Sequence, residues 1–92
     1  MNFPSSMIIG GEAVAAVGGG TYESINPADE SVICSLPAGG VEDANAAVTA
    51  ARKAFDEGSW ATMAPSRRGR VLRKLADLVR KHRDELAQLE TL

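Results

Sequence analysis

Cys34 and His82 are the residues of this sequence whose types are used most often in nucleophilic and general acid–base catalysis. They are the single cysteine and the single histidine of the chain, and they fall on different expected elements, a strand and a helix. A reactive thiolate needs an electropositive, accessible setting, and a catalytic histidine needs an orienting partner. The sequence shows neither, so we expect both side chains to be structural and assign no catalytic residue.

Sites for metal clusters and for phosphates are also missing from the sequence. One cysteine and one histidine cannot form a cysteine-based zinc site. Neither glycine-rich phosphate loop, G-x-x-x-x-G-K-[ST] or G-x-G-x-x-G, occurs. Adjacent acidic residues such as Glu42 and Asp43 lie on expected helices, where neighbouring side chains point about 100° apart and do not face each other. The residues alone therefore predict no cofactor-binding motif and no complete active site.

The charged residues are distributed unevenly along the chain. Residues 1–63 carry two basic and eight acidic residues, a net charge of −6, whereas residues 64–92 carry eight basic and four acidic residues, a net charge of +4. A basic helix can bind nucleic acid, and we keep nucleic-acid binding as one hypothesis. However, the segment has no interleaved aromatic residues, and i,i+4 ion pairs account for its charge: Arg73–Asp77, Asp77–Lys81 and Arg80–Asp84. We expect no nucleic-acid partner.

Membrane attachment and secretion are not expected either. No apolar run approaches the ~18 residues of a membrane span. The N-terminus has no basic residue before an apolar stretch, so it does not resemble a secretory signal. One cysteine in 92 residues is consistent with a reducing compartment, and we predict a cytoplasmic protein without a membrane partner.

The elements that would position any site begin with a glycine-rich and proline-rich region, residues 1–40. Three short β-type runs lie in it, at 7–9, 21–25 and 31–36. Glycine pairs and runs, together with Asn26-Pro27, are typical of the turns between them. We expect a small antiparallel ribbon, which is marginal by itself and needs a covering layer.

Two to three helices are expected after residue 40. Residues 41–57 repeat apolar side chains in steps of three and four, at Val41, Ala44, Ala47, Val48, Ala51 and Phe55. Residues 65–91 do the same, at Val71, Leu72, Leu75, Leu78, Val79, His82, Leu86 and Leu89. Both stripes are expected to be buried. Asp84 could cap a short final helix, which predicts a break near residues 83–84. Trp60 is expected to pack in the turn between the helices.

The order of six segments resembles the aldehyde dehydrogenase family. The helix VEDANAAVTAARKAF at 41–55 is similar to the family pattern E-D-V-D-A-A-V-A-A-A-R-K-A-F. The other five segments are MIIGGE (7–12), YESINPA (22–28), VICSLP (32–37), the series from Trp60 to Leu78, and DELAQLETL (84–92). Together they cover essentially residues 7–92 and identify the chain as a member of this family.

The resemblance implies an α/β fold with a Rossmann-type cofactor domain, of which this chain is about the first fifth. Residues 1–40 would be an N-terminal strand ribbon, and residues 41–92 the helical start of the NAD(P)-binding domain. The family oxidises aldehydes to carboxylic acids with NAD or NADP, through a cysteine thiohemiacetal and thioester. Its catalytic and cofactor-binding residues lie beyond this segment. Cys34 matches a strand position without a chemical role, and the chain alone is expected to be inactive.

The resemblance also implies a structural monovalent cation in some members. Its ligands include the residue pair before Asn-Pro, here Ser24 and Ile25, through backbone oxygen. Another ligand is the aspartate after E-T-L, which would be residue 93. The expected partners are the remainder of the polypeptide and, for the full-length protein, further copies in a homo-oligomer. The alternative hypothesis is a stand-alone helical interaction module without catalytic activity, which docks through the apolar stripe of residues 71–89.

Overall fold

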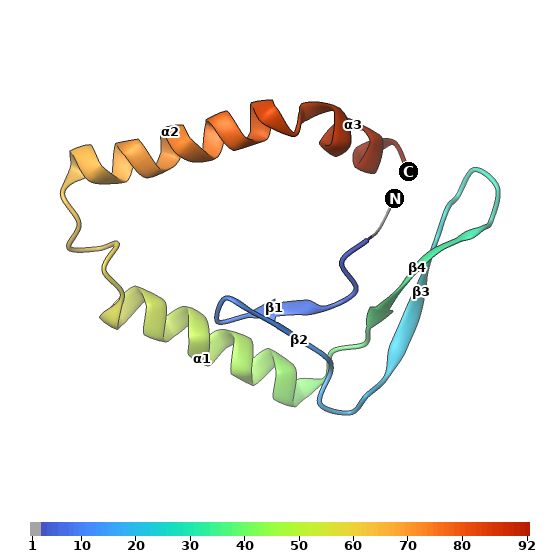
Figure 1. The fold of residues 1–92 in the computed structure, drawn as a ribbon. Helices are drawn as coiled ribbons and strands as arrows, with labels where there is room; N and C mark the ends of the chain where they lie inside the picture. Colours follow the sequence, from blue (N-terminus) through green and yellow to red (C-terminus); the bar gives the residue numbers. More distant parts are fainter. Residues whose placement is uncertain (1–2) are drawn as a thin grey trace. The chain divides into compact units, whose positions relative to one another are not determined.

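The computed structural model describes residues 3–92 (Figure 1). Residues 1 and 2, which the predicted ribbon region 1–40 includes, lie outside the described residues. The chain divides into two compact units, and the first ends at Glu57 while the second begins at Gly58. The predicted domain division at residue 40 stays a prediction.

The first hairpin joins β1 (Met7–Ile9) to β2 (Glu12–Val14), and the two strands are antiparallel. Gly10 and Gly11 form the two-residue turn, with φ values of +62° and +81°. Positive φ at both central residues matches the right-handed twist of a hairpin and favours glycine. The turn and β1 were predicted, but β2 was not, because three residues with one β-branched side chain carry little strand signal.

The second hairpin joins β3 (Thr21–Ile25) to β4 (Val32–Pro37). The Asn26 N–H donates to the Ser31 carbonyl over 2.8 Å, and the Asn26 side-chain oxygen accepts from the Ala28 N–H over 2.9 Å. This local side-chain bond is the reason why asparagine before proline favours a turn. The predicted antiparallel ribbon is confirmed, and the structure divides it into two separate two-stranded sheets (Figure 1).

Helix α1 (Val41–Glu57) has the predicted bounds, but it buries a different face. It packs on β1, where a Cβ added to Gly10 would lie 3.7 Å from the Ala50 Cβ. The predicted stripe instead remains open, with Val41, Val48 and Phe55 exposed by 78%, 68% and 71%. The prediction that this stripe is buried within the chain is therefore wrong. Ala50 is half-buried at this contact, where its small side chain allows a close approach to the hairpin turn.

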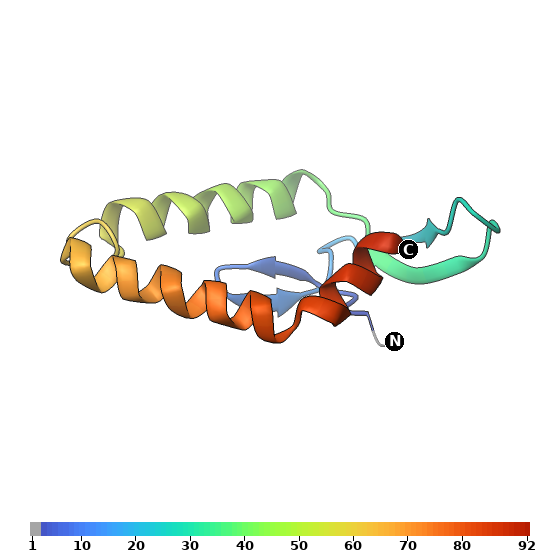
Figure 2. The ribbon, with the colours of Figure 1, turned by 90° about the horizontal axis from the view of Figure 1, so that it is seen from above.

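The second unit contains α2 (Pro65–Lys81) and α3 (Arg83–Thr91), as Figures 1 and 2 show. The predicted break is present, but the residue between the helices is His82, whose φ is −101°. The capping role expected of Asp84 is wrong, because α3 begins at Arg83 and its N-terminus receives no side-chain hydrogen bond. Pro65 starts α2 as predicted, since the first helical N–H needs no partner.

The ion pairs of the second unit also differ from the predicted i,i+4 series. Asp77 pairs with Arg80 over 3.0 Å, three residues away, and His82 Nδ1 lies 3.3 Å from Glu85 Oε2. All four side chains are well exposed, so each pair contributes at most a few tenths of a kcal/mol. The predictions that the second stripe is buried and that Trp60 packs in the turn are also wrong within this chain, because Leu75, Leu89 and Trp60 are exposed.

Little of residues 3–92 is buried. Ala16, 6% exposed, is the buried apolar residue, and Asp43, 5% exposed, is the buried charged one. None of the helices in the described part of the chain is both long and apolar enough to span a membrane. Hydrogen bonds within hairpins and helices therefore carry much of the local structure.

The β1–β2 turn predicts a contrast between two glycines. Gly11 has a φ of +81° and Gly18 does not have a positive φ, and no atom lies within 4 Å of a Cβ added at either position. We expect Gly11→Ala to lower the free energy of unfolding by about 1–2 kcal/mol through backbone strain alone. Gly18→Ala should leave it unchanged or raise it by up to ~1 kcal/mol. Denaturant titration of both variants measures the difference, and equal effects would contradict the turn geometry.

Candidate functional site

Ser24 and Ile25, the predicted cation ligands, lie on β3 at an irregularity of the second hairpin. Ser24 pairs with Cys34, but Ile25 pairs with Val32, so Ile33 has no partner across the ladder. This two-against-one arrangement is a β-bulge, which locally disrupts the backbone hydrogen bonds and bends the strand. The structure thus places an interrupted ladder at the two residues that the resemblance selected.

Metal-binding clusters of the usual kind do not occur near this bulge. Across residues 3–92, no three His, Cys, Asp or Glu side chains come together in a way that could hold a metal ion. Within the described residues, the oxygens that the bulge offers to an ion are those of the backbone and of Ser24. Such oxygens suit a hard cation of low charge better than a transition metal.

Cys34 and His82 belong to different units. Cys34 is a free, half-buried thiol on β4, opposite Ser24. His82 lies between α2 and α3 with its side chain half exposed, next to Glu85. Cys34 is half-buried, as expected, whereas the expected burial of His82 on the apolar stripe is wrong, because this residue is exposed.

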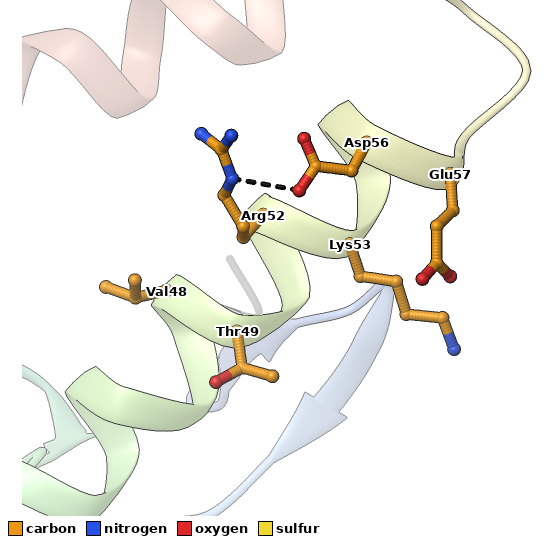
Figure 3. Close-up of a pocket in the computed structure, with 6 residues that line it drawn as sticks. All are labelled: Val48, Thr49, Arg52, Lys53, Asp56 and Glu57. Atoms are coloured by element: carbon orange, nitrogen blue, oxygen red, sulfur yellow. Dashed lines mark hydrogen bonds and ion pairs between the residues drawn. The ribbon is translucent and has the colours of Figure 1, made fainter.

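The outer face of α1 carries an open hollow whose lining residues Figure 3 shows as sticks: Val48, Thr49, Arg52, Lys53, Asp56 and Glu57. The Arg52 Nε donates to Asp56 Oδ2 over 2.9 Å, and its guanidinium carbon lies 5.4 Å from the centre of the Phe55 ring. These contacts hold the Arg52 side chain along the helix. They contain no nucleophile with a base, so this surface does not form a catalytic site.

Asp43 is a buried carboxylate with two backbone hydrogen bonds, and the sequence analysis did not single it out. Its Oδ1 accepts the Val17 N–H over 3.1 Å, and its Oδ2 accepts the Gly40 N–H over 2.9 Å. In the sequence, the residue resembles an ordinary acidic residue of a first helical turn, which the helix dipole favours. The local bond to Gly40 could have been predicted from its place three residues before Asp43, whereas the bond to Val17 depends on the tertiary structure.

The pKa of Asp29 is lowered by its hydrogen bonds with Ser31. The Ser31 hydroxyl donates to its Oδ1 over 2.6 Å, and the Ser31 N–H donates to the same oxygen over 3.0 Å. These hydrogen bonds, the hydroxyl first, lower the pKa of Asp29 below its ordinary value of 3.8. The carboxylate is fully exposed at the tip of the second hairpin, so it organises the turn rather than a reaction.

The Asp29 turn predicts a pH dependence that can be measured directly. Because the folded pKa is lowered, its contribution to stability is present above pH 3.8 and disappears as the pH falls through the folded value. We expect Ser31→Ala to raise the pKa of Asp29 toward 3.8, since the largest cause of the shift is removed. NMR titration of the carboxyl carbon gives the pKa. Ser35→Ala is the control and should leave it unchanged, and an unmoved pKa in Ser31→Ala would contradict the turn.

Comparison with known proteins gives a consistent result. The model of a family described as the aldehyde dehydrogenase family matches residues 14–92. Cytosolic 10-formyltetrahydrofolate dehydrogenase from Pongo abelii is 47% identical over 92 residues, which are 100% of this chain and 10% of that protein. Phenylacetaldehyde dehydrogenase from Pseudomonas fluorescens is 45% identical over 100% of this chain and 18% of its own length.

Solved structures are similar over the same part. The NAD+ complex of aldehyde dehydrogenase from Bacillus cereus is 50% identical with a TM-score of 0.87, over 94% of this chain and 18% of that one. Betaine aldehyde dehydrogenase from Staphylococcus aureus is 38% identical with a TM-score of 0.92, over 99% of this chain and 18% of that one. The chain thus spans between 10% and 18% of the length of these relatives.

Proposed function

The chain belongs to the aldehyde dehydrogenase family, and we propose that it is the N-terminal segment of an enzyme that oxidises aldehydes to carboxylic acids with NAD. NAD serves there as the hydride acceptor. In this proposal the nucleophilic cysteine, its thiohemiacetal and thioester, and the cofactor-binding residues all belong to the remainder of the polypeptide. Residues 41–92 would begin the cofactor-binding domain, and the segment alone would be inactive.

The observation that carries this proposal is the difference between two coverages: the share of this chain that aligns, and the share of each relative that it aligns with. Nearly the whole chain aligns with relatives of which it spans 10% to 18%. The solved NAD+ complex of the Bacillus cereus enzyme supports NAD as the cofactor. The relatives named for formyltetrahydrofolate, phenylacetaldehyde and betaine aldehyde differ in substrate, so the proposal extends to an aldehyde and no further.

The exposed apolar side chains give this proposal a physical basis. Large apolar residues remain open on both units, among them Val48 and Phe55 on α1, and Leu75 and Leu89 on the second unit. Each such side chain gains about 1.5–3 kcal/mol when it is fully buried. A segment that leaves them open has a strong tendency to pack on further polypeptide. The remainder of a family member would supply the missing layer.

The proposed setting is a cytoplasmic enzyme that assembles into a homo-oligomer. A cytosolic location is part of the name of the Pongo abelii relative, which supports the first part. A relative from Arabidopsis thaliana is named as mitochondrial, so the family occupies more than one compartment. The oligomer is proposed from the family resemblance.

A structural monovalent cation at Ser24 and Ile25 is also proposed, and the bulge is the feature of this chain that supports it. Irregular pairing between Ser24 and Ile25 disrupts the ladder where these residues would direct oxygens to an ion. Ser24 is half-buried, so an ion there would be partly shielded from water. The remaining ligands would come from outside the chain. The role proposed for the ion is to stabilise the hairpin against its neighbours.

A chimeric enzyme tests the main proposal. Residues 1–92 replace the equivalent segment of the Bacillus cereus aldehyde dehydrogenase, which is 50% identical. We expect the chimera to oxidise aldehydes with NAD+ at a kcat/KM within about tenfold of its parent, a difference of ~1.4 kcal/mol in barrier. The 92-residue chain alone should show no turnover with the same substrates. Turnover by the chain alone, or an unfolded chimera, would contradict the proposal.

Two variants of the chimera test whether the apolar stripe of α2 is buried in the assembled enzyme, or whether any substitution in this helix lowers stability. Leu75→Gln should lower its free energy of unfolding by about 2–4 kcal/mol, because an amide would replace a buried apolar side chain. Arg73→Gln lies on the opposite face of the same helix and should change it by less than ~0.5 kcal/mol. If both variants are neutral, and the chain alone melts cooperatively as a monomer, the stand-alone interaction module is the better account.

The cation proposal is tested by the stability of the same chimera. We expect K+ or Na+ to raise its free energy of unfolding relative to tetramethylammonium at equal ionic strength, by about 1.4 kcal/mol at ten times the dissociation constant. Deleting Ile33 restores one-to-one pairing and should abolish the difference. Val32→Ala, which keeps the bulge, is the control. The parent enzyme gives the reference, and an unchanged cation effect in the deletion variant would contradict a site at the bulge.

A further inference from the structure

We propose that Asp43 is a clasp that fixes the β3–β4 hairpin to the rest of the first unit. Its two carboxylate oxygens each accept one backbone N–H, from Val17 over 3.1 Å and from Gly40 over 2.9 Å. Val17 precedes the hairpin and Gly40 follows it. One side chain on α1 therefore binds both connections through which the chain enters and leaves the hairpin.

The clasp lies just outside the last backbone pair of the hairpin. At the base of the hairpin, Thr21 pairs with Pro37, and the Ala38 N–H donates to the Gly20 carbonyl over 2.8 Å. Beyond this bond the two connections no longer pair with each other. There the Asp43 carboxylate accepts an N–H from each connection, so the base of the hairpin stays closed where the ladder ends.

The carboxylate is the buried partner in the clasp. Asp43 is 5% exposed, whereas Val17 is 68% exposed and Gly40 is also exposed, so the two hydrogen bonds are partly buried. A buried carboxylate that loses a donor keeps the cost of having left water, which is larger for a charged group. Bonds to a charged acceptor are also stronger than bonds between neutral groups. The Val17 and Gly40 N–H groups therefore favour the closed arrangement.

The neighbouring residues show that this base is closely packed. A Cβ added to Gly39 would lie 3.3 Å from the Met7 sulfur and 3.8 Å from the Asp43 Cβ. The connection after β4 thus runs directly against β1, and glycine leaves the required room. Helix α1 packs on β1, whereas β3 and β4 contact mainly each other. The hairpin is therefore attached to the unit through its base, where Asp43 lies.

The clasp is a positioning device rather than a catalytic one. The hairpin carries the bulge at Ser24 and Ile25. By fixing the orientation of the hairpin, Asp43 would therefore also fix the position of the bulge. The clasp itself does not depend on a cation or on the proposed reaction. Its test is accordingly a measurement of local opening, which has no activity readout.

Hydrogen exchange at single-residue resolution, in the folded full-length protein that carries the chain, tests the clasp. In Asp43→Asn, an NH2 group replaces one acceptor and faces a backbone donor. We expect exchange of the Val17, Gly40 and Ala38 amides to accelerate by about tenfold to a hundredfold, the loss expected for a bond to a charged acceptor. The amides of β1 and of residues 50–57 in α1 should keep their rates.

Two further variants make the result decisive. Asp29→Asn is the matched control, because Asp29 also accepts a backbone N–H but only within its own turn. It should leave Val17 and Gly40 unchanged. Asp43→Glu keeps the negative charge at the helix N-terminus but displaces the carboxylate by one methylene, so it should accelerate the same amides. Unchanged exchange at Val17 and Gly40 in both Asp43 variants, or equal acceleration throughout residues 3–57, would overturn the clasp.

Discussion

Scarcity of buried apolar surface is the constraint on which the rest of this structure depends. Because Ala16 is the one buried apolar side chain within residues 3–92 themselves, apolar packing among these residues contributes little to holding the elements together. Specific hydrogen bonds take its place: the ladders of two short hairpins, the turn around Asn26, and the Asp43 carboxylate. Such bonds fix direction well but contribute only about 0.5–1.5 kcal/mol each.

The same constraint explains why α1 has two different faces. The helix contacts β1, and its small residue Ala50 meets the turn glycine Gly10, where a close approach needs little side-chain volume. Its larger apolar residues, Val48 and Phe55 among them, point to an open side. An apolar helix face of this kind is stable in water only when another layer of the protein covers it.

The polar side chains of this segment have structural roles. The described residues organise turns, helix ends and the base of a hairpin, and their titratable groups lie mostly in water. Asp29 orders an exposed turn, and Asp43 connects backbone segments. In both cases the carboxylate holds backbone groups in place through hydrogen bonds.

Sequence alone determined the elements whose signals are local. The repeat of three and four fixed α1 at Val41–Glu57, Pro65 marked the start of α2, and glycine pairs and Asn26-Pro27 marked turns. The tertiary structure decided which face of α1 is buried, where β2 pairs, and that Asp43 reaches Val17, 26 residues away. These features depend on partners distant in the chain, and a pattern of neighbouring residues does not contain them.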